Sequence, residues 1–372
     1  MNNQKQKVLI TGGAGFIGSH TADALKAKGY TARILDCLLK PVHTDRWPKY
    51  VLGKGFELIK GDVRNKKDWV RALQGIDYVF HLAAYQDQLP DFSTFFHINT
   101  AGTAMMYEVI AEKRFPVKKI VLASSQFVYG DGKYQCRHSG KIFYPELRPA
   151  AQKEKATWPI LCEHGKPAKF FPFRENQLAS PPNAYSLSKI ALEQLAFRFG
   201  KTHTIPTVAL RYSIVQGPRQ SPLNAYSGAL RIFVTQALAG LPITVYEDGK
   251  QLRDFVNVAD VVAANMLVMQ NKKADYQIFN VGCGKGYRVL DFAKMVKHIT
   301  GTPSPIVVGG FRRTDTRHAV SDISKLKGLG WRPRYRPEKA IRDYMRWIKT
   351  EKFDLGFVRH TAKKLKDLGV VG

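Results

Sequence analysis

The stretch Lys7–Gly18 reads Lys-Val-Leu-Ile-Thr-Gly-Gly-Ala-Gly-Phe-Ile-Gly. Its apolar start, Val8–Ile10, is typical of a strand buried on both faces, and the apolar spacing after the glycines predicts a helix. In such a strand–turn–helix, Gly12 permits a tight turn, Gly15 lets backbone approach a pyrophosphate, and Gly18 lets the helix pack on the strand. The stretch therefore predicts a dinucleotide-binding unit, with its glycines spaced Gly-x-x-Gly-x-x-Gly rather than Gly-x-Gly-x-x-Gly.

A second predicted strand, Thr31–Leu35, ends at Asp36. A carboxylate about 20 residues past such glycines accepts hydrogen bonds from the adenosine ribose hydroxyls and repels a 2′-phosphate. Because no Arg follows Asp36 directly, the pattern favours NAD over NADP. A glycine-rich turn without a ligand is the alternative, and the combination of strand, turn, helix and acid argues against it.

Short apolar strands alternate with helix patterns along the chain, as in an α/β protein with a doubly wound parallel sheet. Residues 131–182 interrupt this rhythm and show no clean period. The further strands that we expect are Glu57–Lys60, Tyr78–Leu82, Lys119–Ala123, Thr207–Tyr212 and Ile278–Val281. The further helices are expected at 95–112, 183–200, 229–238, 258–269, 289–300, 321–330 and 337–349.

The 372-residue chain carries 58 Lys and Arg against 30 Asp and Glu, a formal net charge of +28. Such an excess suits anionic ligands and also nucleic acid. The cations are spread without an aromatic–basic repeat, so we expect a basic surface rather than nucleic acid binding. Four cysteines are too few for a secreted disulfide framework, and no apolar run approaches membrane-spanning length. We therefore expect a cytoplasmic protein without a membrane partner.

Tyr185 and Lys189 lie four residues apart, so one helix face presents both side chains. A phenol is a poor base at neutral pH because its pKa lies near about 10. A neighbouring ammonium and a positive nicotinamide stabilise the phenolate and bring that pKa toward the working range. Ser125, at the end of a predicted parallel strand, is placed to hold a substrate oxygen. Together with the glycine turn and Asp36, these residues predict a catalytic set of Ser125, Tyr185 and Lys189.

With these motifs the chain resembles the extended short-chain dehydrogenases/reductases, within the NAD-dependent nucleotide-sugar epimerase and dehydratase family. The similarity spans roughly residues 7 to 349. Its later markers are Gly217-Pro218-Arg219-Gln220, Arg253-Asp254-Phe255-Val256 and Leu329-Gly330-Trp331. By motif, the resemblance implies NAD contacts at Gly12, Gly15, Phe16, Ile17, Gly18, Asp36, Asp62, Val63, Leu82, Ala83, Ala84, Asn99, Tyr185 and Lys189.

The family fold implies a Rossmann domain for NAD and a smaller, discontinuous C-terminal domain for a nucleotide-diphosphate sugar. We expect residues 1–212 to form the first, with 131–182 as an insertion. Residues 213–372 mainly form the second, with 250–282 partly returning to the Rossmann domain. The implied substrate contacts are Ser125, Gln126, Arg219, Arg253, Arg312 and Asp315. An Arg fork suits phosphate. The family expectation is a homodimer through the helices at 97–113 and 183–200.

Two departures from the family pattern bear on the reaction. Dehydratases of the family place Asp-Glu after the catalytic Thr, where this chain has Gln126 and Phe127, which do not transfer protons. Dehydration is therefore disfavoured, and reversible oxidation and reduction at C4, an epimerisation, is the default. Many relatives also have an Asn that binds the diphosphate where this chain has Ile214, so phosphate contacts must be arranged differently.

Several other functions stay open. A nucleotide-sugar reductase or an oxidising decarboxylase of the same family would consume or produce NADH, which an epimerase does not. The charge also keeps open a non-catalytic nucleotide- or RNA-binding protein with the same fold. Intact Ser125, Tyr185 and Lys189 argue against a pure binding protein, because binding does not need them.

A narrower resemblance, in 81–96, 216–233 and the long insertion, is to the branch that contains dTDP-L-rhamnose 4-epimerase. In that branch the insertion carries cysteines of the metal-knuckle type. Here it carries two Cys-x-His pairs, Cys136 with His138 and Cys162 with His164. Two thiolates and two imidazoles form a tetrahedral zinc set, and the alternative is an ordinary exposed loop. Such a zinc ion would be structural and take no part in catalysis.

Overall fold

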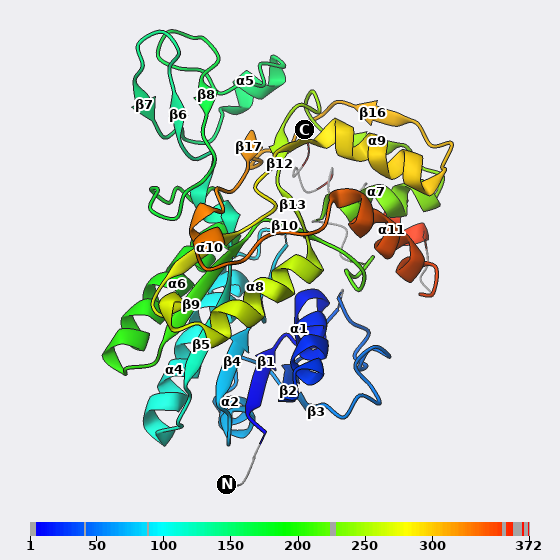
Figure 1. Cartoon of the computed structure of the whole chain (residues 1–372). Helices are drawn as coiled ribbons and strands as arrows, with labels where there is room; N and C mark the ends of the chain where they lie inside the picture. Colours follow the sequence, from blue (N-terminus) through cyan, green and yellow to red (C-terminus); the bar gives the residue numbers. More distant parts are fainter. Residues whose placement is uncertain are drawn as a thin grey trace.

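A central seven-stranded sheet organises the computed structural model, which describes residues 5–40, 42–87, 89–223, 228–351, 355–359, 367 and 371 (Figure 1). Every strand pairing in this sheet is parallel. The spatial order is β3 (Glu57–Lys60), β2 (Thr31–Asp36), β1 (Lys7–Thr11), β4 (Tyr78–His81), β5 (Lys119–Ser125), β9 (Thr207–Tyr212) and β14 (Ile278–Val281). The predicted doubly wound α/β fold is confirmed.

Helices cover both faces of the sheet. On one face α1 (Phe16–Ala27) packs against α8 (Val258–Gln270), and the strand residues beneath them form one apolar core. The other face carries α2 (Lys66–Leu73), α4 (Gly102–Lys113) and α6 (Ala184–Thr202) over a second core. Because β14 and α8 come from beyond residue 250, the chain leaves the sheet after β9 and returns to it.

The helix expected at 95–112 begins earlier and is not uniform. It starts as α3 (Phe92–Phe95), passes through a π-helical turn at Phe96–Ala101, and continues as α4. Asn99, inside the π-helical turn, is fully buried. π-Helical turns are frequent where a helix serves a functional site, and this one lies beside the end of β4.

A smaller lobe follows β9, at the right of Figure 1. Its apolar core lies between three helices and includes stacked Phe255 and Phe292 rings with centroids 4.0 Å apart. The helices are α7 (Ala229–Leu238), α9 (Val289–Thr300) and α11 (Pro337–Ile348). The strand groups are β10 (Ile214–Gln216) with β13 (Phe255–Asn257), β11 (Ile243–Val245) with β16 (Ile306–Val308), and β12 (Leu252–Arg253) between β15 (Tyr287–Arg288) and β17 (His318–Ala319).

The helix expected at 321–330 is shorter, and α10 covers only Ser324–Gly328. The residues before it are engaged elsewhere. The Ser321 amide donates to the Asp254 carboxylate at 3.3 Å, and the Asp322 amide donates to the Phe173 carbonyl at 2.8 Å. These bonds tie the segment to the lobe and to the end of the insertion, so it does not start a helical turn.

The insertion forms a separate protrusion at the upper left of Figure 1. It contains regular structure that the sequence pattern did not predict. A three-stranded antiparallel sheet has the order β7 (Ile142–Phe143), β6 (Tyr134–Gln135) and β8 (Lys169–Phe170), and α5 (Ala150–Glu154) lies beside it. Strands of two residues are too short to show a period in the sequence. Among the described residues, no helix has the length and apolar character needed to span a membrane.

Candidate active site

The glycine turn lies between β1 and α1 and depends on the absence of side chains. Gly12 has a φ of 66°, and a Cβ atom there would lie 2.8 Å from the Ala83 backbone nitrogen. A Cβ atom on Gly18 would lie 2.3 Å from the Gly12 carbonyl oxygen. The first turn of α1 carries no acidic residue, so the helix itself presents no negative side chain to an anion at its N-terminus.

Asp36, at the end of β2, connects the glycine turn to the next loop. One carboxylate oxygen accepts a hydrogen bond from the Ala14 amide at 3.0 Å, and the other accepts one from the Leu38 amide at 2.9 Å. The carboxylate is nearly buried. Its position beside the glycine turn is the one that the sequence predicted for an acceptor of ribose hydroxyls.

A single cavity of about 1020 Å³ begins at the glycine turn, crosses the carboxyl ends of the central strands and reaches the smaller lobe. Seventeen of the twenty residues predicted for catalysis, NAD or substrate line it. They are Gly12, Gly15, Phe16, Ile17, Gly18, Asp36, Asp62, Val63, Leu82, Ala83, Ala84, Ser125, Tyr185, Lys189, Arg253, Arg312 and Asp315.

Asn99 was predicted to contact NAD but does not line the cavity. Its side-chain oxygen accepts from the Tyr85 amide at 2.8 Å, and its side-chain nitrogen donates to the Tyr85 carbonyl at 3.1 Å. The same nitrogen donates to the Ser188 hydroxyl at 2.9 Å. Asn99 therefore fixes the loop after β4 against α6, because a buried amide must satisfy its hydrogen bonds.

Gln126 and Arg219, predicted to contact substrate, are also absent from the cavity wall. The Gln126 side chain is buried beneath it, with its oxygen 3.5 Å from the Ser321 hydroxyl. Arg219 pairs with Asp23 of α1 at 2.7 Å, and its guanidinium lies 5.0 Å from the centre of the Tyr50 ring. Both side chains are held by protein partners that the local motif does not reveal.

A chain of hydrogen bonds fixes His81, the last residue of β4. The Thr103 hydroxyl donates to the Asn99 carbonyl at 2.6 Å and therefore accepts from His81 Nε2 at 2.9 Å. His81 Nδ1 then accepts from the Thr11 hydroxyl at 2.7 Å, which accepts from the Ala83 amide at 3.1 Å. Burial, helped by Lys189, lowers the pKa of His81 to about 3. His81 is thus a neutral structural residue.

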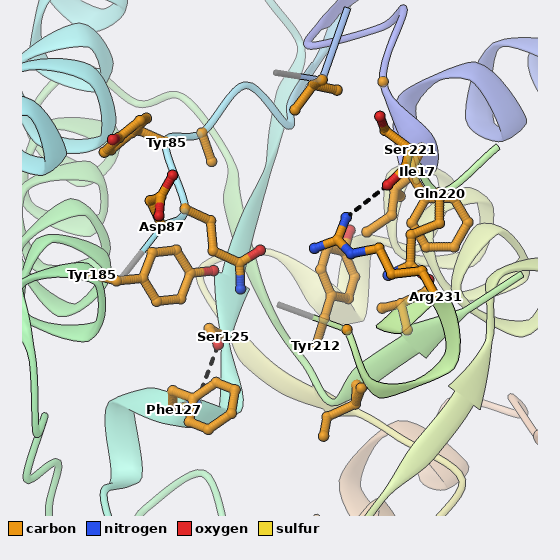
Figure 2. A pocket seen from close by; sticks show the side chains of 18 of the residues that line it. Ile17, Tyr85, Asp87, Ser125, Phe127, Tyr185, Tyr212, Gln220, Ser221 and Arg231 are labelled. Carbon is orange, nitrogen blue, oxygen red and sulfur yellow. Dashed lines mark hydrogen bonds between the residues drawn. The ribbon is translucent and has the colours of Figure 1, made fainter. Parts of the chain in front are cut away.

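α6 presents Tyr185 and Lys189 because a capping box fixes its start. Asn183 Oδ1 accepts from the Ser186 amide at 3.0 Å, and Ser186 Oγ accepts from the Asn183 amide at 3.2 Å. Tyr185 then lies in the first helical turn with its hydroxyl directed toward Ser125 at the end of β5 (Figure 2). The predicted catalytic side chains therefore meet at one point of the cavity.

Burial raises the pKa of Tyr185 to about 12, and its hydrogen bond with Ser125 opposes the rise. Burial also lowers the pKa of Lys189 to about 8, and the Glu193 carboxylate opposes that shift. The Lys189 ammonium donates to the Ala123 carbonyl at 2.8 Å and lies 5.9 Å from the centre of the Tyr185 ring. The protein alone therefore leaves the Tyr185 phenol protonated at neutral pH.

Glu193 supports this arrangement one helical turn beyond Lys189. Arg211 of β9 holds the carboxylate with two bonds, at 2.9 Å and 2.6 Å, and Ser124 donates to the same carboxylate. Glu193 and Arg211 are both almost fully buried. The pair supplies a fixed negative charge behind Lys189, which favours its ammonium form.

At the far end of the cavity, Arg253 holds Asp315. Arg253 Nη2 donates to an Asp315 carboxylate oxygen at 2.8 Å and to the Thr316 carbonyl at 2.8 Å. Burial opposes ionisation, but Arg253 and then Arg312 keep the pKa of Asp315 below its usual value. The Arg312 guanidinium lies 5.1 Å from the centre of the Tyr246 ring. The arrangement offers two guanidinium groups and one ring on the same wall.

The structure adds a cavity residue that sequence analysis missed, Arg231 on α7. It is 5% exposed, and one of its nitrogens donates to the Ser221 carbonyl at 3.2 Å. Figure 2 shows its guanidinium on the wall opposite Tyr185. Burial lowers the pKa of Arg231 to about 10, and Tyr344 and Asp87 oppose the shift, so it stays charged. A signal existed, because Arg231 is the one charged residue in the α7 sequence.

Three of the four predicted metal ligands come together in the insertion. Ligand atoms of Cys136, Cys162, Glu163 and His164 all lie within 4.8 Å of one another, and Cys136 Sγ lies 3.6 Å from His164 Nδ1. Glu163 takes the place predicted for His138. The His138 ring lies against the His164 ring instead, with centroids 4.7 Å apart.

Comparison with known proteins agrees with this geometry. The model of the NAD dependent epimerase/dehydratase family matches residues 8–152 and 161–282. A dTDP-L-rhamnose 4-epimerase of Burkholderia thailandensis is 32% identical over 352 residues, covering 93% of this chain and 96% of the relative.

Two solved structures have similar folds. The Thermotoga maritima UDP-glucose 4-epimerase with UDP-glucose has a TM-score of 0.76 at 27% identity, covering 92% of this chain and 99% of that one. The Bacillus cereus UDP-glucuronic acid 4-epimerase with UDP-glucuronic acid and NAD has a TM-score of 0.76 at 26% identity, with coverage of 92% and 99%.

Proposed function

Because this chain belongs to the NAD-dependent epimerase/dehydratase family, we propose that it is an NAD-dependent nucleotide-sugar 4-epimerase. The observation that carries the proposal is the position of Tyr185. Its hydroxyl meets Ser125 between the glycine turn at one end of the cavity and the Arg253–Asp315 pair at the other. A nucleotide sugar anchored at the far end would present its sugar ring to this hydroxyl.

In the proposed mechanism, Ser125 holds the C4 oxygen and Tyr185 takes the proton of the C4 hydroxyl. Bound NAD supplies the acceptor and later the donor of the C4 hydride, together with a positive ring. Lys189 stabilises the Tyr185 phenolate through its ammonium charge. The 4-keto sugar then rotates in the site, so that the opposite face of C4 meets the hydride donor. Tyr185 returns the proton, and the configuration at C4 is inverted.

The cavity wall beside Ser125 favours epimerisation over dehydration. Elimination of water needs an acid and a base at the sugar, and Phe127 lines the cavity where dehydratases of the family place a carboxylate. Gln126 is buried and bonded away from the cavity. At this point of the wall, the bond with Ser125 places the Tyr185 hydroxyl for proton transfer.

We assign the glycine turn and the strand ends to NAD, with residues 1–212 as the cofactor domain. Hydrogen bonds from the Ala14 and Leu38 amides hold the nearly buried Asp36 carboxylate beside the glycine turn. There it would bind a ribose diol and repel a 2′-phosphate. Asn99 becomes a positioning residue, because it holds the Tyr85 backbone instead of facing the cavity.

Residues 213–372, apart from the returning elements, form the proposed nucleotide-sugar domain. Arg253, Arg312 and Arg231 supply positive charge for the diphosphate. Ile214 stands where many relatives have an Asn that binds the diphosphate. Arg231 lines the same cavity, and its guanidinium offers hydrogen-bond donors that would replace that contact.

We further propose that the cluster in the insertion binds a structural zinc ion through Cys136, Cys162, His164 and Glu163. Two thiols, an imidazole and a carboxylate are a donor set that zinc accepts. Each cysteine begins a tight turn, closed by the Gly140 amide at 3.0 Å and by the Gly165 amide at 2.9 Å. Elemental analysis should find one zinc per chain, and Cys162→Ser should lose it. Protein purified without chelators that contains no zinc would contradict the proposal.

We propose a homodimer through the outer faces of α4 and α6, in the cytoplasm. Leu187 and Phe199, on α6, are 44% and 37% exposed, and Phe96 beside α4 is 37% exposed. Such apolar side chains are suited to burial between two copies. The mass in solution tests the dimer: a monomer at micromolar concentration would contradict it.

The function is tested with dTDP-, UDP-, GDP- and CDP-sugars, followed by NMR of the sugar ring. A C4-inverted product without added NAD is the expected result. Accumulation of NADH would instead identify an oxidase or decarboxylase, and consumption of added NADH a reductase. No product, with salt-sensitive retention of RNA, would support the binding-protein alternative.

A further inference from the structure

The insertion carries two buried cations that the proposed chemistry does not use. Arg148, just before α5, is 4% exposed, and Lys153, on α5, is 1% exposed. Cations are almost never fully buried unless they are paired or hydrogen-bonded. Their partners therefore show what these residues do.

Both cations donate to the backbone of one loop, residues 309–317, between β16 and β17. The Lys153 ammonium donates to the Arg313 carbonyl at 2.5 Å and to the Arg312 carbonyl at 3.4 Å. Arg148 Nη2 donates to the Asp315 carbonyl at 3.1 Å. The insertion thus holds three of the four backbone carbonyls between residues 312 and 315 of the loop.

A second connection runs through Glu247, which is buried between the insertion and the loop. Arg148 holds the Glu247 carboxylate with two bonds, at 2.7 Å and 3.0 Å. Arg317, at the end of the loop, donates to the same carboxylate at 2.8 Å. The Glu247 amide donates to the Gly310 carbonyl at 2.8 Å. Both ends of the loop are therefore fixed to one buried ion cluster.

The other side of this loop is cavity wall. Arg312, Thr314 and Asp315 line the cavity, and Asp315 pairs with Arg253. In the described chain, residues 309–317 contain no helix or strand beyond one isolated bridge, from Arg312 to Val371. Without a ladder of its own, the loop depends on side-chain donors for its shape.

We propose that the insertion is a positioning element for the nucleotide-diphosphate end of the cavity, acting through Arg148 and Lys153 on residues 309–317. The inference rests on the proposed function, because it concerns the same cavity. The two cations do not contact substrate. They hold the loop in the shape that presents Arg312 and Asp315, so they set nucleotide affinity and leave the chemistry at Tyr185 unchanged.

Lys153→Met tests this, because methionine keeps the apolar stem and removes the donors. Lys155→Met is the matched control, since Lys155 follows α5, carries the same charge and is exposed. Binding of UDP and dTDP is measured by calorimetry on the full chain, together with NAD content, kcat and KM. We expect the Kd of the bound nucleotide and the KM to rise about tenfold, a loss of about 1.4 kcal/mol, with kcat within about threefold.

Lys153→Arg should recover most of the affinity, because it keeps the charge and the donors. Unchanged Kd and KM in Lys153→Met would overturn the inference alone. A Met variant that lost NAD and kcat in parallel with nucleotide binding would also overturn it, since that pattern indicates general unfolding. A wild-type protein that bound neither nucleotide would contradict the proposed function and the inference together.

Discussion

The two ends of the cavity are built in different ways. The proposed cofactor end consists of strand ends and one helix N-terminus, and its critical contacts are between backbone atoms, as at Gly12 and Ala83. The proposed nucleotide-sugar end consists of loops held by buried charges, such as Arg148 with Glu247 and Arg253 with Asp315. One end is shaped by the sheet, and the other by side chains far apart in the sequence.

This difference predicts how each end fails. A site shaped by backbone contacts is disturbed by a single added methyl group. A charge-built site tolerates small changes of volume and is disturbed when one partner of a buried pair is removed. Tyr185 and Ser125 stand between the two ends, where the chemistry is proposed.

Tyr185→Phe should have the largest effect, because it removes the proposed base from the junction of the two ends. We expect kcat to fall at least about 10³-fold, within the range that general acid–base groups contribute. NAD content and nucleotide affinity should stay largely intact, since the glycine turn, Asp36 and the Arg253–Asp315 pair keep their contacts. The measurement is single-turnover NMR of the sugar product.

Tyr212→Phe is the control for that variant. Tyr212 also lines the cavity, but its hydroxyl donates to Asn265 at 2.8 Å, away from Ser125. Its turnover should stay within about tenfold of wild type, because the bond it loses is structural. Appreciable turnover in Tyr185→Phe, or equal losses in both variants, would contradict the role of Tyr185.

Gly12→Ala should disable the cofactor end alone. The new Cβ atom would lie 2.8 Å from the Ala83 backbone, at a φ of 66°, so the turn must move. We expect purified protein to retain less than about a tenth of the wild-type NAD while nucleotide affinity is kept. Absorbance and calorimetry measure the two quantities.

Gly29→Ala is the control, because it adds the same backbone strain at a position away from the glycine turn. Gly29 has a φ of 84°, but a Cβ atom there meets nothing within 4 Å. That variant should lose about 1 kcal/mol of stability and keep its NAD. If both alanine variants kept their NAD, the cofactor end would not be shaped by backbone contact as described.

Arg231→Met should weaken the nucleotide-sugar end by removing a buried guanidinium from the cavity. We expect KM to rise about tenfold and NAD content to stay unchanged, because one charge-assisted bond is worth about 1.5–3 kcal/mol. Arg231→Lys should recover part of the affinity. If the KM rose only for nucleotide sugars that carry a carboxylate, and the Kd of UDP and dTDP did not change, Arg231 would contact the sugar and not the diphosphate.

The smallest expected effect is on the pH dependence. The pKa of Lys189, lowered by burial to about 8, means that its ammonium is lost as the pH rises through that value. The phenolate of Tyr185 then loses its stabilising charge, so kcat should fall above about pH 8. Lys189→Arg keeps the charge and should lack this alkaline limb. A wild-type kcat that still rose at pH 9.5 would contradict the assignment.

The cofactor end could be predicted from local sequence because its geometry is local. Spacing alone selected Gly12, Gly15, Gly18 and Asp36, which line the cavity, and the doubly wound parallel sheet followed from the alternation of strands and helices. Asn99 was the exception at this end. Its motif position suggested NAD, whereas a π-helical turn directs its amide to Tyr85.

The nucleotide-sugar end resisted prediction because its contacts join distant segments. Arg148 and Glu247 are 99 positions apart, and Arg148 and Asp315 are 167 apart. Hydrophobic periodicity gives no information on pairs so far apart in the sequence. Arg219 was therefore predicted to contact the diphosphate, whereas in the structure it pairs with Asp23 on α1. The substitution of Ile214 for Asn predicted a different arrangement of the phosphate contacts, without indicating Arg231.

The most direct test of the central claim follows the C4 hydrogen. The nucleotide sugar found in the panel is labelled with deuterium at C4 and incubated with the enzyme in ordinary water, without added NAD. Oxidation and re-reduction by one bound cofactor predict a C4-inverted product that retains its deuterium. Loss of the label to water would contradict hydride return at C4, and inversion at another carbon would contradict the proposed position of the sugar at Tyr185.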